Sequence, residues 1–218
     1  MAAVLLMIPG LLEGIWIWPT AWLFVATFGL ISCLASGLLA VLRPASFRVR
    51  QQSFVAPREK QQPLVDSLGL LFYLAFTLCW LASIPLDVFR LKLLAAPPLP
   101  VQAIGAVSVI LGLSIAYLAI GQNRFAAPTI HDQSAEAQQV IQSGLYAVVR
   151  HPFYAGMLLV YPGAALWLGS YAAAISSIGF LILTLARVVI EERYLREHLP
   201  GYGAYAKRVR VKLIPGLL

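Results

Sequence analysis

Two groups of polar side chains stand at the two ends of a long apolar stretch near the C-terminus. The segment RHPFY (residues 150–154) opens this stretch, and Arg187, Glu191 and Glu192 close it. Ionisable groups at membrane depth are costly, so each of them calls for a partner or a function. A guanidinium, an imidazole, a phenol and carboxylates can together bind a small molecule that carries charges of both signs. These residue types predict a binding pocket but do not by themselves name a reaction.

The spacing of these residues predicts that the two groups meet. Arg187 and Glu191 are four positions apart, so they share one helical face. The apolar stretch from Pro152 to Ile190 is long enough for two spans and has helix-breaking residues near its middle, which predicts a tight hairpin. A hairpin brings its ends side by side, so His151 and Tyr154 should lie near Arg187 and Glu191. The breaking residues are Pro162, Gly163, Gly169 and Ser170.

Each group also has a purely structural interpretation. Arg150 would contact lipid headgroups, His151 would cap the helix and Tyr154 would join an aromatic belt. Arg187 would snorkel toward the membrane surface and pair there with Glu191. The residues alone leave this interpretation and the pocket hypothesis both open.

The composition is that of a membrane protein. Of the 218 residues, 60% are hydrophobic and only 11% are charged, and the mean hydropathy is +0.81. A soluble domain of this length cannot hide so much apolar surface. The net charge is +7, but Lys and Arg lie between and after apolar segments, which favours anionic lipid over nucleic acid as the counterpart.

The apolar segments predict an all-α integral membrane bundle with about five transmembrane helices, because each span needs roughly 20 apolar residues. The hairpin supplies two of these helices, and a short apolar segment, Met1 to Leu12, precedes the first span. One membrane domain covering residues 1–218 is the natural division. The other three predicted spans are Pro19 to Leu42, about Ser67 to Leu86, and about Leu99 to Gly121.

The distribution of basic residues predicts the orientation. The loop at 45–63 carries four basic residues against a single Glu59, so the positive-inside tendency puts it in the cytoplasm together with both ends of the hairpin. The tail from Tyr202 to Leu218 interleaves aromatic and basic residues and predicts an interfacial anchor on an anionic leaflet.

Other kinds of site have no support in the sequence. There is no glycine-rich phosphate loop, no serine nucleophile elbow and no His/Cys cluster with metal-binding spacing. Cys33 and Cys79 each lie inside an apolar stretch. We therefore predict neither a disulfide nor a metal site.

A series of short motifs between about Pro128 and Pro215 resembles the isoprenylcysteine carboxyl methyltransferase family, in order and at matching spacing. The earlier spans resemble the bacterial, multi-span members of that family. The resemblance divides the chain into N-terminal spans at 1–127 and a cofactor-binding methyltransferase core at 128–218. The motifs are Gly144-Leu145-Tyr146, RHPFYAG at 150–156, Arg187 with Glu191-Glu192, and Gly201-Tyr202 with Tyr205.

The resemblance implies that S-adenosyl-L-methionine is held at the cytoplasmic mouth of the helices. Arg187 would face the substrate and, with Glu191, form the catalytic pair. His131 stands where the family tends to have Gln, and Gln138 and Gln139 depart from the usual loop residues. The residues implied for the cofactor are His131, Gln138, Gln139, Val140, Ile141, Tyr146, His151, Pro152, Phe153, Tyr154 and Glu191.

The implied function is an integral membrane methyltransferase, in a bacterial inner membrane with its active site facing the cytoplasm. Its acceptor would be a lipidic or isoprenylcysteine-like molecule, and methylation of a carboxylate is the first expectation. A phospholipid amine, a thiol and a small hydrophobic acid remain open as acceptors. Its other partners would be membrane lipids, with no nucleic acid and no metal. Two alternatives remain: an NADPH-dependent enzyme similar to the sterol reductases, which share an RHPxY-like motif, and a non-enzymatic scaffold whose buried charges pair helices.

Overall fold

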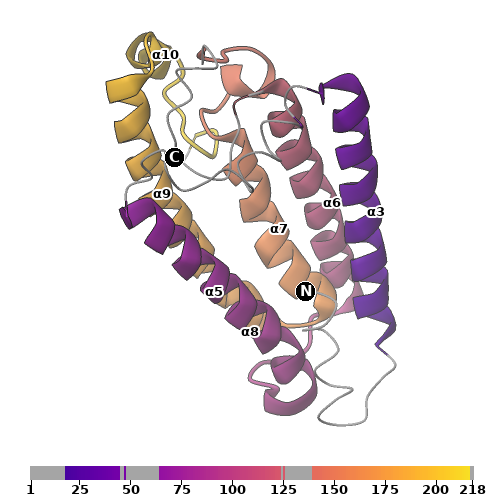
Figure 1. The fold of residues 1–218 in the computed structure, drawn as a ribbon. Helices are drawn as coiled ribbons and strands as arrows, with labels where there is room; N and C mark the ends of the chain where they lie inside the picture. Colours follow the sequence, from indigo (N-terminus) through magenta and orange to yellow (C-terminus); the bar gives the residue numbers. More distant parts are fainter. Residues whose placement is uncertain (1–17, 45–46, 48–63, 124, 126–138, 217–218) are drawn as a thin grey trace. The chain divides into compact units, whose positions relative to one another are not determined.

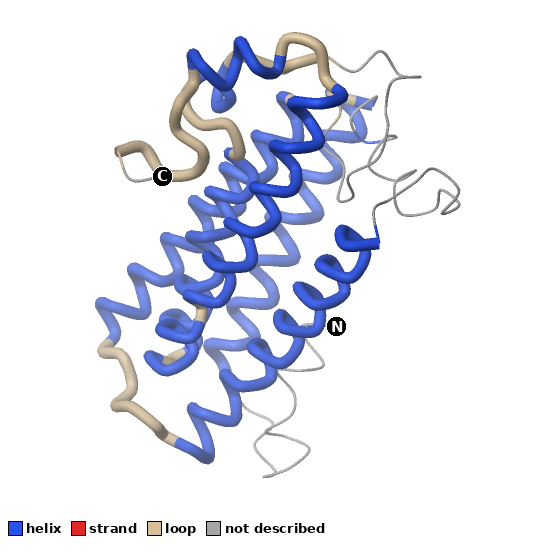
Figure 2. Tube along the Cα trace, turned by 90° about the vertical axis from the view of Figure 1, so that its left-hand side faces the viewer, coloured by secondary structure: helices blue, strands red, loops and turns tan. Residues whose placement is uncertain are grey.

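The computed structural model describes residues 18–44, 47, 64–123, 125 and 139–216, and every regular element within these ranges is helical (Figure 1; Figure 2). The predicted all-α class is therefore confirmed. In chain order the elements are α3 (Pro19–Leu42), α5 (Leu64–Leu86), the π-helical turn η1 (Asp87–Leu91), α6 (Leu99–Gln122), the 3-10 turn η3 (Gly144–Ala147), α7 (Pro152–Leu168), α8 (Tyr171–Ser176), α9 (Ile178–His198) and α10 (Tyr202–Arg208).

The helices have the length and composition of membrane spans. In the described part of the chain, four stretches are long and apolar enough to cross a bilayer: α3, α6, the end of α5 with η1 (Leu71–Leu91), and α8 with α9 (Tyr171–His198). The shorter α7, with 17 residues, is also apolar. Large apolar side chains lie on the outer surfaces of these helices, where Val41 is 78% and Leu99 is 77% exposed. Lipid must cover this surface, so the chain is an integral membrane protein.

The predicted spans agree closely with the observed helices. Helix α3 has the predicted bounds, α6 extends one residue further to Gln122, and α5 starts three residues earlier, at Leu64. Helix α6 begins directly after Pro97-Pro98, which cannot continue a preceding helix. The predicted N-terminal segment and all of the basic loop at 45–63 except Phe47 lie outside the described residues.

The hairpin turns at the last two of the four residues predicted to break the helix, Gly169 and Ser170. Pro162 and Gly163 lie inside α7, so the expected break there is wrong. The chain reverses at Gly169, which has a φ of +97° that only glycine adopts without strain, and at Ser170, whose Oγ caps α8. Beyond the turn, the ring of Tyr161 on α7 stacks on that of Phe180 on α9, with centroids 3.6 Å apart.

The chain forms two compact units, each built from three separate stretches, with boundaries that fall inside helices. The first unit holds the turn of the hairpin, and the second holds both of its polar ends. The first comprises Met1–Cys33, Phe72–Leu113 and Met157–Ile182, and the second comprises Leu34–Leu71, Ser114–Gly156 and Leu183–Leu218.

Within the first unit, polar groups at the hairpin turn join it to α5 and η1. Ser170 Oγ donates to Asp87 Oδ2 at 2.6 Å, and the Leu93 N–H donates to Asp87 Oδ1 at 2.9 Å. Trp80 Nε1 donates to the carbonyl of Ala173 at 2.9 Å. Both oxygens of the buried Asp87 carboxylate therefore have donors, which offsets the cost of removing this acid from water.

Helices α6 and α7 approach each other closely through two glycines. A methyl group on Gly105 would lie 2.6 Å from the Gly163 carbonyl oxygen, which is backbone and cannot move aside without shifting α7. We expect Gly105→Ala to lower the free energy of unfolding by about 1–3 kcal/mol, the usual cost of overpacking. Gly29→Ala is the control, because a methyl group there meets nothing within 4 Å. Thermal unfolding in detergent compares the two, and equal stability would contradict the close approach.

Candidate functional site

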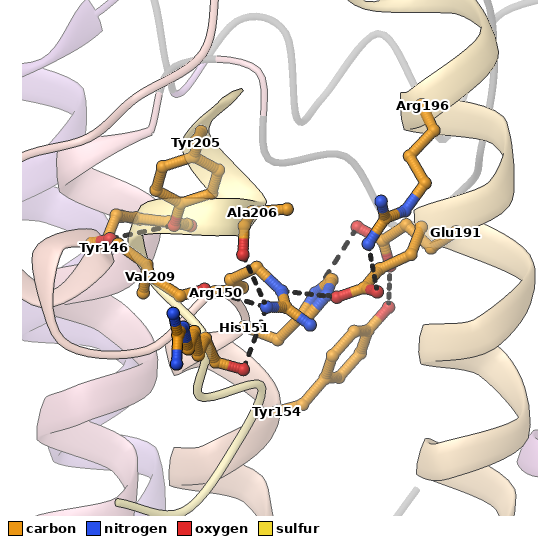
Figure 3. A network of polar contacts seen from close by, with 11 residues as sticks. Tyr146, Arg150, His151, Tyr154, Glu191, Arg196, Tyr205, Ala206 and Val209 are labelled. Carbon is orange, nitrogen blue, oxygen red and sulfur yellow. Dashed lines mark hydrogen bonds and ion pairs between the residues drawn. The ribbon is translucent and has the colours of Figure 1, made fainter. Parts of the chain in front are cut away.

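The second unit brings the start of α7 and the last turns of α9 together. Pro152 occupies the first position of α7, where its missing N–H leaves no helical bond unmade. The Tyr154 hydroxyl donates to Glu191 Oε2 at 2.8 Å (Figure 3). Arg187 Nε donates to the Tyr154 oxygen at 2.8 Å. His151 Nδ1 lies 3.9 Å from Glu191 Oε1. The four residues that the hairpin is predicted to gather therefore lie within one polar network.

The two adjacent glutamates occupy different environments. The side chain of Glu191 is 27% exposed, whereas that of Glu192 is 8% exposed. Glu192 Oε1 lies 3.3 Å from His151 Nε2, and Glu192 Oε2 lies 3.7 Å from Arg196. Glu191 is thus open to a ligand on one side, while Glu192 is enclosed by protein groups.

Arg150 is the partner that encloses Glu192. Its Nε donates to Glu192 Oε1 at 2.6 Å, and its side chain is only 5% exposed. Its Nη1 donates to three carbonyls of the C-terminal tail: Val209 at 2.8 Å, Arg210 at 2.9 Å and Ala206 at 3.4 Å (Figure 3). The interpretation of Arg150 as a headgroup contact is therefore wrong, because the tail folds over the guanidinium and removes it from the surface.

The tail is also joined to the start of α7 through the backbone. The Arg150 N–H donates to the Val211 carbonyl at 3.0 Å, and the His151 N–H donates to the Lys212 carbonyl at 2.9 Å. The aromatic side chains of α10 face inward, so their predicted role as membrane anchors is wrong, whereas the basic side chains at 207, 208 and 210 are exposed. The inward cluster consists of Leu199, Tyr202, Tyr205, Ala206 and Val209.

Two tyrosines connect the tail to η3 and α6. Tyr205 donates its hydroxyl to the Tyr146 carbonyl at 2.8 Å. Burial raises the pKa of Tyr205 to about 12, so this donor keeps its proton at neutral pH. The Tyr146 hydroxyl accepts from Asn123 Nδ2 at 3.4 Å and donates to the Ala119 carbonyl at 3.5 Å, and burial also raises the pKa of Tyr146. The Tyr146 ring is thus held between the end of α6 and the tail.

The structure describes four of the remaining predicted cofactor residues and does not describe the other two. Val140 packs on the inward cluster of α10, Ile141 is half-buried and Gln139 is exposed. The ring of Phe153 is half-buried and lies 5.7 Å from that of Tyr154. His131 and Gln138 lie outside the described residues.

Several residues of this network received no site role from the sequence. Burial raises the pKa of Tyr202, and so do the negative charges of the Glu192 and Glu191 carboxylates. Arg150 and Glu192 form the buried pair. Their positions in the sequence, directly next to His151 and Glu191 in the same motifs, could have indicated that Arg150 and Glu192 belong to the site.

The network can bind a ligand that carries both charges. The partly exposed Glu191 carboxylate attracts a cation, Arg187 attracts an anion, and the rings of Phe153 and Tyr154 offer apolar and π-electron faces. The tyrosine between them holds the cationic and the anionic side chain at a defined separation.

Comparison with known families gives a match over the second half of the chain. Residues 101–201 are similar to the phospholipid methyltransferase family. No individual curated protein matches the chain. The matched region runs from the first turn of α6 to the residue before α10 and includes both polar ends of the hairpin. The similarity indicates a membrane methyltransferase that acts on lipid.

Proposed function

We propose that the chain is an S-adenosyl-L-methionine-dependent methyltransferase that methylates a carboxylate on a lipidic or isoprenylcysteine-like acceptor. The observation that carries the proposal is the pair of 2.8 Å hydrogen bonds that link Arg187, Tyr154 and Glu191. They hold a cation and a partly exposed anion on two sides of one phenol. The similarity to a family of lipid methyltransferases supports the reaction class.

The side chains fit the chemistry of this cofactor. S-adenosyl-L-methionine carries a sulfonium, an ammonium, a carboxylate and an adenine, so its pocket needs a carboxylate, donors and aromatic faces. Glu191 suits the ammonium, and the first-turn N–H groups of α7 suit the carboxylate, while the ring of His151 lies beside Glu191 at this end of the pocket. The rings of Phe153 and Tyr154 suit the adenine or the sulfonium. Tyr146 would contribute to the pocket as a fixed ring, because its hydroxyl is hydrogen-bonded to Asn123 and to the Ala119 carbonyl.

The acceptor would be bound by Arg187. A guanidinium pairs with a carboxylate through two parallel hydrogen bonds, which fixes the direction of the attacking oxygen. When bound, S-adenosyl-L-methionine supplies a methyl group whose bond to the sulfonium breaks with both electrons remaining on sulfur. Because a carboxylate carries no proton to remove, the protein needs only to align the reactants and exclude water. The apolar part of the acceptor would enter from the bilayer.

We place this site at the cytoplasmic face of a bacterial inner membrane. Exposed arginines and lysines lie on α9, on α10 and just after α10, beside the network, and such residues are enriched on the cytoplasmic side. They are Arg193, Arg196, Lys207, Arg208 and Arg210.

Cofactor binding is the first test. Titration calorimetry of the purified full chain should detect S-adenosyl-L-methionine and its demethylated product. Glu191→Gln should weaken this binding roughly 10- to 100-fold, because a charge-assisted hydrogen bond is lost. Glu197→Gln removes an exposed charge from the same helix and should leave the affinity unchanged.

A folded chain that binds neither compound would overturn the proposal. Binding of NADPH at the same site, measured by competition, would favour the reductase alternative instead.

The bond formed identifies the acceptor class. Methyl transfer from labelled cofactor to lipid extracts should give a product that releases methanol in alkali, because a methyl ester hydrolyses and an N-methyl group does not. Alkali-stable label would show that the methyl group is on nitrogen or sulfur and would refute the carboxylate assignment.

A further inference from the structure

We infer that Arg150 and Glu192 are positioning residues, which hold His151 and the C-terminal tail in place for the ligand-binding side chains Tyr154 and Glu191. The inference rests on the proposed function and assigns opposite tasks to the two adjacent glutamates. Glu191 contacts the cofactor, and Glu192 keeps the first turn of α7 and the tail together.

The contacts of Arg150 identify the tail as its target. A guanidinium is a planar set of five donors. In Arg150, one edge donates to Glu192, and Nη1 donates to carbonyls within or just after the last turn of α10. Carbonyls at the end of a helix have no intrahelical partner, and a cation is stabilised beside them. Arg150 therefore caps the C-terminal end of α10 and at the same time pairs with Glu192 on α9.

The contacts of Glu192 orient His151. A carboxylate only accepts hydrogen bonds, so Glu192 Oε1, 3.3 Å from His151 Nε2, favours the proton on that nitrogen. This contact turns Nδ1 toward Glu191, at 3.9 Å. The buried Glu192 therefore orients the imidazole, and Nδ1 faces the partly exposed Glu191 as a result.

The geometry of an α-helix requires that Glu191 and Glu192 have different tasks. Neighbouring residues on an α-helix point about 100° apart, so Glu191 and Glu192 cannot both face Tyr154. Glu191 accepts from the Tyr154 hydroxyl, and Glu192 faces Arg150. The exposed fractions of 27% and 8% follow the same division.

The test compares Glu192→Gln with Glu191→Gln in the full chain. The amides of Arg150 and His151 donate to the tail at Val211 and Lys212, so their hydrogen exchange reports whether the tail is in place. Glu192→Gln should accelerate this exchange roughly tenfold or more and also weaken binding of S-adenosylhomocysteine, since a buried charge-assisted contact is lost. Glu191→Gln should weaken binding and leave the exchange unchanged.

Three results would overturn the inference. Unchanged exchange in Glu192→Gln would mean that Glu192 does not hold the tail. Faster exchange with unchanged affinity would mean that the contact is structural only. Equal effects of both substitutions on exchange would remove the division between the glutamates.

Arg150→Lys provides a second variant if Glu192→Gln does not fold. Lysine keeps the charge but cannot contact Glu192 and the tail carbonyls with separate edges. In this variant, the exchange rate of the amides at positions 150 and 151 and the affinity for S-adenosylhomocysteine should lie between those of the wild type and those expected for Glu192→Gln. If the wild-type chain binds neither S-adenosyl-L-methionine nor S-adenosylhomocysteine, the proposed function fails. The exchange comparison alone then decides whether Arg150 and Glu192 hold the tail.

Discussion

Arg150→Met should lower the free energy of unfolding by about 3–5 kcal/mol, because removing one member of a buried ion pair leaves the other charge without its main partner. Among the residues that the structure describes, Glu192 would keep His151 at 3.3 Å and the more distant Arg196 at 3.7 Å. Three tail carbonyls would lose their donor at the same time. Thermal or denaturant unfolding of the purified chain in detergent measures the change.

The double variant Arg150→Met/Glu192→Gln separates the ion pair from a general loss of packing. Removing both charges avoids the unpaired buried carboxylate, so the double variant should be more stable than Arg150→Met alone. Arg210→Met is the matched control, because this exposed arginine lies on the tail and its removal should change stability by no more than about 0.5 kcal/mol. A loss below about 1 kcal/mol in Arg150→Met would contradict the burial of the pair.

Arg187→Ala should reduce kcat/KM for the acceptor roughly 100- to 1000-fold, while the affinity for S-adenosyl-L-methionine changes little. The reason is that the proposed function gives Arg187 the acceptor carboxylate and gives Glu191 the cofactor. Transfer of labelled methyl to a lipid carboxylic acid measures the first quantity, and calorimetry measures the second.

Two further arginine variants sharpen this result. Arg187→Lys keeps the charge but not the two parallel donors, so it should recover only part of the activity. Arg193→Ala removes an exposed arginine from the same helix and should leave kcat/KM near the wild-type value. If Arg187→Ala lost cofactor affinity and activity in the same proportion, Arg187 would belong to the cofactor side of the network.

The helices could be predicted from the sequence because the bilayer sets their length. The observed bounds of α3, Pro19–Leu42, equal the predicted ones, since an apolar run and its polar ends leave little freedom. The hairpin was predictable for the same reason, and with it the approach of Tyr154 to Glu191. The position of its turn was less predictable, because Gly163 allows α6 to approach α7 instead of ending the helix.

The family resemblance added what residue types could not provide. A guanidinium beside a carboxylate is as typical of a structural pair as of a binding site. The order and spacing of the motifs singled out methyl transfer, and the match over 101–201 supports that class independently of the contacts.

By itself, the sequence determined the all-α membrane class, the spans and the set of motifs whose members meet, because these depend on local hydrophobicity and chain direction. Only the tertiary structure decided that Arg150 is buried and that Glu192, not Glu191, is its partner. The burial depends on a tail that returns some sixty residues later in the chain, and the pairing depends on which side of α9 faces the start of α7. Whether a charge is enclosed or exposed is determined by packing against such distant segments, which no local pattern records.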